Sequence, residues 1–366
     1  MNHPIRNRFV WAGIVSLLAW VLLRTVAPGG AIRWTPAMVE AARAMETTLA
    51  GVAEYCRENG IPVDQATDPN GTCLIGPEHS ELFTSLGQLE AKRTSLAPDM
   101  AGLVAHLLRE AGVGEGDRVA VGASGSFPGL LVATLAAVNA LGAEPVSIIS
   151  VGASSYGATR PGFHLADIYG IMAAESLAPG TPAAVSLGGS GDVGSEFDPS
   201  FREVLLGDLR ARGLRVIQVR GLRENVRERL ALYGLEPDLG GAEEGDPAIP
   251  QASGSSAAGG EPLAAFVNVG GAEVNLGTSF LVLNLPPGLV WPPDDGSEES
   301  AERSGSDALT FPPRLERGMI FEMLDRGIPV IHLLHVRGLA LRYGLPWDPL
   351  PLPRAASTRL KDSQAP

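Results

Sequence analysis

The chain contains four segments in which a short apolar run leads directly into a loop of glycine and small polar residues. They read RVAVGASGSFPG from Arg118, VSIISVGASSYG from Val146, AAVSLGGSGDVG from Ala183 and AAFVNVGGAEVNLG from Ala264. Such runs are typical of buried β-strands, and the small residues after them permit positive φ angles and a close approach of a ligand to the backbone. Because the carboxyl ends of parallel strands lie at one edge of a sheet, the four loops predict a binding site at that edge.

The rest of the chain alternates between helix and strand patterns. Helices are expected from Thr35 to Gly60 and over 98–111, 130–141, 165–177, 199–212, 222–232 and 315–326. Strands are expected around Val119 and over 146–151, 183–187, 215–219, 264–269 and 329–334. This order predicts an α/β domain over 92–354 with a doubly wound, mainly parallel sheet, and a helical segment over 35–91 packed beside it.

Two internal segments and the C-terminus do not fit this core. Residues 237–262 and 291–310 are acidic, rich in Gly, Ser and Pro, and almost free of aliphatic side chains. They cannot bury enough apolar surface to offset chain entropy, so we predict disordered inserts there and a disordered tail over 355–366. The inserts carry most of the formal net charge of −13. The remaining body is nearly neutral, and we expect no nucleic-acid partner because such a partner needs a basic face.

The N-terminus contains one uncharged apolar run, residues 9–23, which follows two arginines. As a helix its fifteen residues span about 22 Å, less than the ~30 Å hydrocarbon core, so the run fits either a short transmembrane anchor over 9–26 or the core of a signal peptide. Pro28 disfavours cleavage and favours the anchor. The arginines then place residues 1–8 in the cytoplasm and the bulk of the chain outside the cytoplasmic membrane.

The only two cysteines are Cys56 and Cys73. In an oxidising compartment we expect them to form a disulfide, which would add about 3 kcal/mol in the chain-entropy model. A second interpretation stays open. Cys56 ends an apolar helical repeat that begins at Met38, and it can simply be the last buried side chain of that helix.

The loop after the first of the four strands resembles a nucleophile elbow. Residues 122–126 read GASGS, close to the G-x-S-x-G pattern and on the required strand, turn and helix, although the last position is Ser. The partners available for a triad are Asp192, His164, His332 and His335. Ser124 and Ser126 can instead cap the helix and satisfy the turn, or bind an anion at the helix N-terminus. We therefore assign no catalytic residue.

Six polar residues that follow the predicted strand ends form the expected ligand-binding rim: Ser124, Ser126, Ser154, Ser155, Asp192 and Asn268. Hydroxyl and free N–H groups suit a carboxylate or phosphate, whereas Asp192 suits an ammonium group or a divalent ion. An α-amino acid end carries both charges, so a glutamate-like terminus is the expected ligand. Asp167 is a further, weaker candidate.

Cofactor and metal signals are weak. The chain has no Walker A motif and no intact G-x-G-x-x-G motif, so no cofactor is predicted. His332 and His335 are three residues apart in an apolar strand pattern. A regular strand would point them to opposite faces, so we predict no metal site between them.

Five long blocks, in order, resemble the poly-gamma-glutamate system protein family, membrane-associated proteins encoded with bacterial capsule-polymer machinery. The blocks are KRTSLAPDMAGLVAHLLREAGVGEGDRVAVGASGSFPGL from Lys92, EPVSIISVGASSYGA from Glu144, AAVSLGGSGDVG from Ala183, FVNVGGAEVNLG from Phe266 and RGIPVIHLLHVRGLALRYGLPWDPLPLP from Arg326. The resemblance covers most of residues 35–354, and the acidic inserts depart from it.

The resemblance implies an accessory role in making or exporting poly-γ-glutamate, with the membrane subunits of that machinery as partners. It implies no catalytic residue. The elbow pattern keeps a second function class open, an extracytoplasmic serine hydrolase or transferase acting on γ-glutamyl or related amide bonds. A histidine within hydrogen-bond reach of Ser124 or Ser126 would favour this second class.

Overall fold

The computed structural model describes residues 32–237, 262–293 and 309–355. The predicted anchor over 9–26 and residues 1–8 lie outside the described residues, as do most of the two predicted inserts and of the tail. Among the helices of the described ranges, none is both long enough and apolar enough to cross a membrane.

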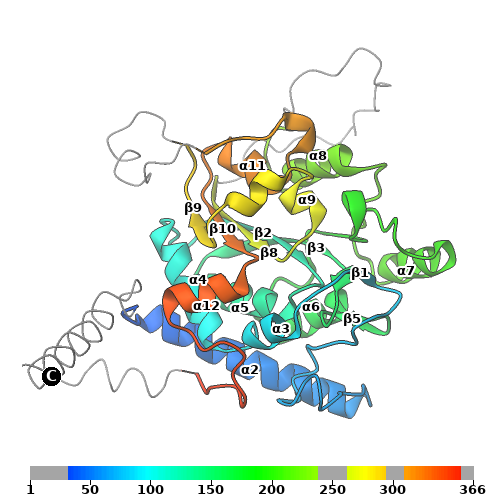
Figure 1. Ribbon diagram of the computed structural model, residues 1–366, viewed down its shortest axis with the longest axis vertical. Helices are drawn as coiled ribbons and strands as arrows, with labels where there is room; N and C mark the ends of the chain where they lie inside the picture. The colour runs from blue at the N-terminus through cyan, green and yellow to red at the C-terminus, as the bar shows by residue number, and fades with distance from the viewer. Residues whose placement is uncertain (1–31, 238–261, 294–308, 356–366) are drawn as a thin grey trace, which may run out of the picture.

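A six-stranded sheet lies at the centre of the molecule, in the order β7-β3-β2-β8-β10-β9 (Figure 1). Its parallel strands are β2 (Arg118–Ser124), β3 (Glu144–Ser150), β7 (Ala184–Ser186), β8 (Leu263–Val269) and β10 (Val330–Leu333). The edge strand β9 (Gly288–Val290) runs antiparallel to β10. The prediction of an α/β fold with a mainly parallel sheet is confirmed.

Helices cover both faces of this sheet. One face packs against α4 (Asp99–Glu110), α5 (Pro128–Ala140) and α6 (Leu165–Ala174), and α2 (Pro36–Glu58) packs on the outer side of these helices. The other packs against α8 (Leu222–Leu232), α9 (Glu273–Leu276) and α11 (Met319–Leu324), which lie above the sheet in Figure 1. The side chains of a strand alternate between faces, so Val119 and Val121 join the first core and Ala120 joins the second.

The N-terminal segment is only partly helical. Thr35 caps α2 by accepting the N–H of Met38, and the helix ends at Glu58, close to the predicted Gly60. The chain over 59–88 then runs through turns and the short strand β1 (Phe83–Ser85), which pairs with β4 (Ala153–Ser154), before α3 (Leu89–Thr94). Residues 59–88 are rich in glycine and polar turn formers and contain no helical repeat. They therefore form turns instead of the predicted helical segment.

A disulfide joins Cys56 at the end of α2 to Cys73 in the turns that follow it. Both side chains are buried in the core on the α2 face of the sheet. The two interpretations of Cys56 are therefore compatible, because it is both the last buried side chain of the helical repeat and a disulfide partner.

Two predicted elements differ from the observed ones. The segment 215–219 makes only a single bridge, between Val216 and Val185 of β7, and is not a full strand. The helix expected over 315–326 is divided into a short turn, Arg314–Glu316, and α11. Gly318 makes the break: a Cβ there would lie 2.3 Å from the Gly277 nitrogen, so the backbones approach too closely for a side chain or a continuous helix.

The path of the chain through the sheet creates a switch point between β2 and β8. From β2 the chain moves outward through β3 to β7, and it returns through α7 (Pro199–Ala211) and α8 to β8, on the opposite side of β2. In open α/β sheets, ligands bind outside the carboxyl ends of the strands at such a point. The fold therefore directs attention to the loops that follow β2, β3 and β8.

Candidate functional site

A pocket of about 720 Å³ lies at the carboxyl ends of the parallel strands. Its floor includes Ser124 at the end of β2 and Ser150 at the end of β3. Its walls come from the loop before α3, the loop after β7, the start of α9 and the start of α12 (Val336–Tyr343). The edge predicted from the four glycine-containing loops is thus hollowed in the structure.

The structure brings three of the six predicted rim residues to this pocket. Ser124, Ser126 and Ser154 line it. Ser155, Asp192 and Asn268 are buried but are not among the lining residues. The amide of Asn268 donates to the Gly270 carbonyl at 3.0 Å and contacts the ring of His332.

The serine hydroxyls of the pocket differ in their partners. Ser126 Oγ accepts the backbone N–H of Ser154 at 3.0 Å. Ser124 is 3% exposed, and its hydroxyl has no hydrogen-bond partner among the described residues. Because an unpartnered buried hydroxyl is unfavourable, and because this one lines the pocket just before α5, it is available to a ligand.

The sequence prediction missed Lys92 of α3. Its side chain is 2% exposed and lines the pocket. Its ammonium donates to Ser154 Oγ at 2.7 Å and to the Ser126 carbonyl, and it lies 3.8 Å from the centre of the Phe127 ring. Burial lowers the pKa of Lys92 to about 7, so the neutral amine and the ammonium are both populated near neutral pH.

A sequence signal for Lys92 does exist in the choice of basic residue. The chain has 28 lysines and arginines, and only Lys92 and Lys361 are lysine. Arginine stays charged when buried, whereas the lysine pKa shifts readily. The one lysine within the predicted fold therefore stands out in a chain that otherwise uses arginine.

The pocket has an acidic and a basic end. Glu196 follows β7, and the carboxylate of Glu273 accepts the N–H of Gly191 in the same loop at 2.9 Å, so both acids lie toward β7. His335 and Arg337 follow β10, on the other side of β2. Lys92 and the serine hydroxyls complete the lining as the buried polar part of the pocket.

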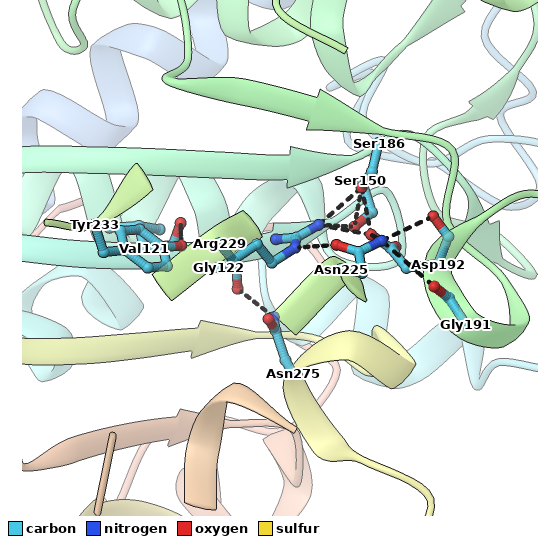
Figure 2. Close-up of polar contacts among 10 residues, drawn as sticks. All are labelled: Val121, Gly122, Ser150, Ser186, Gly191, Asp192, Asn225, Arg229, Tyr233 and Asn275. Atoms are coloured by element: carbon cyan, nitrogen blue, oxygen red, sulfur yellow. Dashed lines mark hydrogen bonds and ion pairs between the residues drawn. The ribbon is translucent and has the colours of Figure 1, made fainter. Parts of the chain in front are cut away.

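Asp192 takes part in a buried ion pair beneath the pocket. Its carboxylate accepts Arg229 Nη2 at 2.6 Å, and both side chains are fully buried. Arg229 also donates to Ser186 Oγ at 2.8 Å and to Asn225 Oδ1 at 3.0 Å (Figure 2). Asp192 therefore holds the loop after β7 in place, and its charge is already neutralised by Arg229.

This network was not predictable from the sequence. Arg229 lies in the helical segment LRENVRERL, in which most residues are charged and few are apolar. The sequence therefore does not distinguish a buried arginine there from its exposed neighbours. Two other residues on the same face of the sheet donate to backbone carbonyls of β2 (Figure 2). Tyr233 donates to the Val121 carbonyl at 3.0 Å, and Asn275 donates to the Gly122 carbonyl at 2.9 Å.

None of the histidines that the structure describes hydrogen-bonds to Ser124 or Ser126. His332 contacts Asn268 at 3.0 Å, and burial lowers its pKa to about 4, so its ring is neutral. The His164 ring caps α6 by accepting the backbone N–H of Ala166. The Asp167 carboxylate accepts the backbone N–H of His164 in the same cap. The triad that the elbow pattern suggested is not assembled here.

His332 and His335 do not point to opposite faces. Their ring centres are 6.0 Å apart in an edge-to-face arrangement. The prediction assumed a regular strand, but β10 ends at Leu333, so the alternation does not extend to His335. Across the described ranges, no three His, Cys, Asp or Glu side chains are grouped to hold a metal ion.

Comparisons with models of known protein families, with curated proteins and with solved structures found no match. The chemistry of the pocket itself therefore carries the functional argument.

Proposed function

We propose that the pocket binds the free α-amino acid end of a glutamate-like ligand. The observation that carries this proposal is the separation of charge across the pocket, with Glu196 and Glu273 at one end and Arg337 at the other. A zwitterionic terminus presents an ammonium and a carboxylate together, so it matches both ends at once. A simple anion would be repelled by the acidic end.

The interior of the pocket suits the side chain of such a ligand. Ser124 offers an unpartnered hydroxyl, and Ser126 and Ser154 offer hydroxyls that each already accept one hydrogen bond. These groups can donate to a side-chain carbonyl or carboxylate oxygen. The Arg337 guanidinium can hold the α-carboxylate through two parallel N–H donors. The predicted preference for a glutamate-like terminus thus remains, with Glu273 rather than Asp192 as the ammonium partner.

We place this pocket in an accessory protein of poly-γ-glutamate synthesis or export. The five sequence blocks that resemble the family support this role. The apolar run over 9–23 supports a single-pass anchor in the cytoplasmic membrane with the folded domain outside it. The disulfide between Cys56 and Cys73 also supports an oxidising compartment, because such bonds are rare in the cytosol.

Calorimetric titration of the full chain with γ-L-glutamyl-L-glutamate tests the ligand assignment. We expect binding, and we expect that N-acetylation or amidation of the α-carboxylate weakens it about tenfold each, since either change removes one charge contact of about 1.4 kcal/mol. Equal affinity for the capped and free dipeptides would contradict the proposal.

The cellular role is tested separately by affinity purification from native membranes. We expect the ligase and export subunits of poly-γ-glutamate synthesis to co-purify with the full chain. A variant with both Glu273→Gln and Arg337→Ala should still co-purify but support less polymer. Recovery of the full chain without these subunits would contradict the accessory role and leave the ligand assignment standing.

A further inference from the structure

We infer that Lys92 and Ser154 form a serine–lysine pair that cleaves an amide bond of the ligand held in this pocket. The inference rests on the proposed function, because the amino acid end held at the charged rim would place the neighbouring γ-amide over Ser154. It adds a reaction to what is otherwise a binding site.

The geometry of the pair is that of a nucleophile and its base. Lys92 Nζ lies 2.7 Å from Ser154 Oγ, within the range for direct proton transfer. Both residues line the pocket, Ser154 being 6% and Lys92 2% exposed. The backbone closes over them: a Cβ on Gly87 would lie 3.1 Å from both Lys92 Cε and Ser154 Oγ. The pair is therefore shielded from bulk water and still lines the pocket.

The surroundings of Lys92 favour the neutral amine over the charged ammonium. Within the described residues no carboxylate forms an ion pair with its ammonium, whose contacts are an uncharged hydroxyl, a carbonyl and the Phe127 ring. The other ionisable groups around the pocket are Glu196, Glu273, His335 and Arg337. Burial brings the pKa of Lys92 to about 7, as a general base working near neutral pH requires.

The reaction that this pair would catalyse is transfer of the acyl group from the amide to water. Ser154 Oγ attacks the amide carbon while neutral Lys92 accepts its proton, and the C–N bond breaks as Lys92 returns that proton to the leaving amine. Water then attacks the resulting ester, Lys92 accepts the water proton and passes it to Ser154 Oγ, and the acid is released. The unpartnered Ser124 hydroxyl in the same pocket is the donor available to the developing oxyanion.

A serine-directed fluorophosphonate probe and γ-L-glutamyl-p-nitroanilide test this inference on the full chain. We expect the probe to modify Ser154, identified by peptide mass spectrometry, and we expect release of p-nitroaniline at a rate that rises as the pH passes through about 7. Ser154→Ala and Lys92→Met should each lower the rate at least about 100-fold. The matched control is Ser147→Ala, at a buried serine of β3 outside the pocket, which should change neither readout.

Lys92→Arg separates a catalytic role from a structural one. Arginine can donate hydrogen bonds to Ser126 and Ser154 but cannot act as a base near neutral pH, so the folded variant should lose the activity. Retained activity in Lys92→Arg, or modification of any residue other than Ser154, would overturn the inference.

The two proposals can fail independently. Binding of γ-L-glutamyl-L-glutamate without probe modification would reject the serine–lysine pair and leave the binding site intact. Modification of Ser154 without dipeptide binding would support the pair and reject the ligand class. Ser154→Ala removes one hydroxyl of the pocket but keeps the rim charges, so it should weaken dipeptide binding far less than it lowers the cleavage rate.

Discussion

Replacing Arg229 by Met is predicted to be among the most destabilising single changes in this protein. The substitution leaves the Asp192 carboxylate buried without its cation and removes the donor to Ser186 Oγ. Removing one partner of a buried ion pair costs about 3–5 kcal/mol, because the remaining charge is then uncompensated in a medium of low polarity.

A matched arginine on the surface gives the comparison. Arg212 forms ion pairs with Asp167 and Asp208, but its side chain is 37% exposed. Solvent screening limits such contacts to about 0.2–1 kcal/mol. Arg212→Met should therefore cost several-fold less than Arg229→Met, although both substitutions remove one positive charge from an ion pair.

Urea denaturation followed by circular dichroism measures both costs. The double variant Asp192→Asn with Arg229→Met should be less destabilised than the sum of its single variants by about 0.5–3 kcal/mol, since no unpaired charge then remains. A cost below about 1 kcal/mol for Arg229→Met would refute the reasoning. It would mean that Asp192 is solvated and free to meet a ligand, as the sequence pattern first suggested.

Three further results are expected. Replacing Cys56 and Cys73 by Ala should lower the free energy of unfolding by about 3 kcal/mol in denaturation without reductant, and no loss would mean that the bond does not form in the native protein. Because burial lowers the pKa of His332 to about 4 from 6.5, the unfolded chain takes up the proton first. The contribution of neutral His332 to the free energy of unfolding should be complete above pH 6.5 and decrease by about 1.4 kcal/mol per pH unit as the pH falls toward 4. His332→Gln should flatten that slope in pH-dependent melting. Glu273→Gln and Arg337→Ala should each weaken γ-L-glutamyl-L-glutamate binding about tenfold by calorimetry without lowering the melting temperature, whereas unchanged affinity would remove the charged rim from the site.

The periodic parts of the sequence predicted the fold well. The strands of the four glycine-containing loops and the long helices appear close to their expected positions, since alternating and helical repeats report directly on buried faces. The short edge strand β9 and the break at Gly318 were not predictable in this way. Both depend on the approach of distant backbone segments, which local periodicity does not contain.

The candidate site was predictable in location but not in composition. Ser124, Ser126 and Ser154 lie where strand ends meet, a consequence of parallel topology that the sequence order already implied. Lys92 comes from a helix that precedes the sheet, and Arg229 from the far side of it. Which polar side chains turn inward from such elements is decided by tertiary packing, so strand-end reasoning could not find them.

The most direct test of the pocket as the ligand site is hydrogen–deuterium exchange of the full chain with and without γ-L-glutamyl-L-glutamate. The account predicts added protection in peptides that cover the loops after β2, β3, β7 and β8 and the start of α12, all of which line the pocket. A second hollow, lined by α2 and α6, serves as the internal reference and should not change. Protection confined to that second hollow, or absent from the strand-end loops at saturating dipeptide, would contradict the central claim.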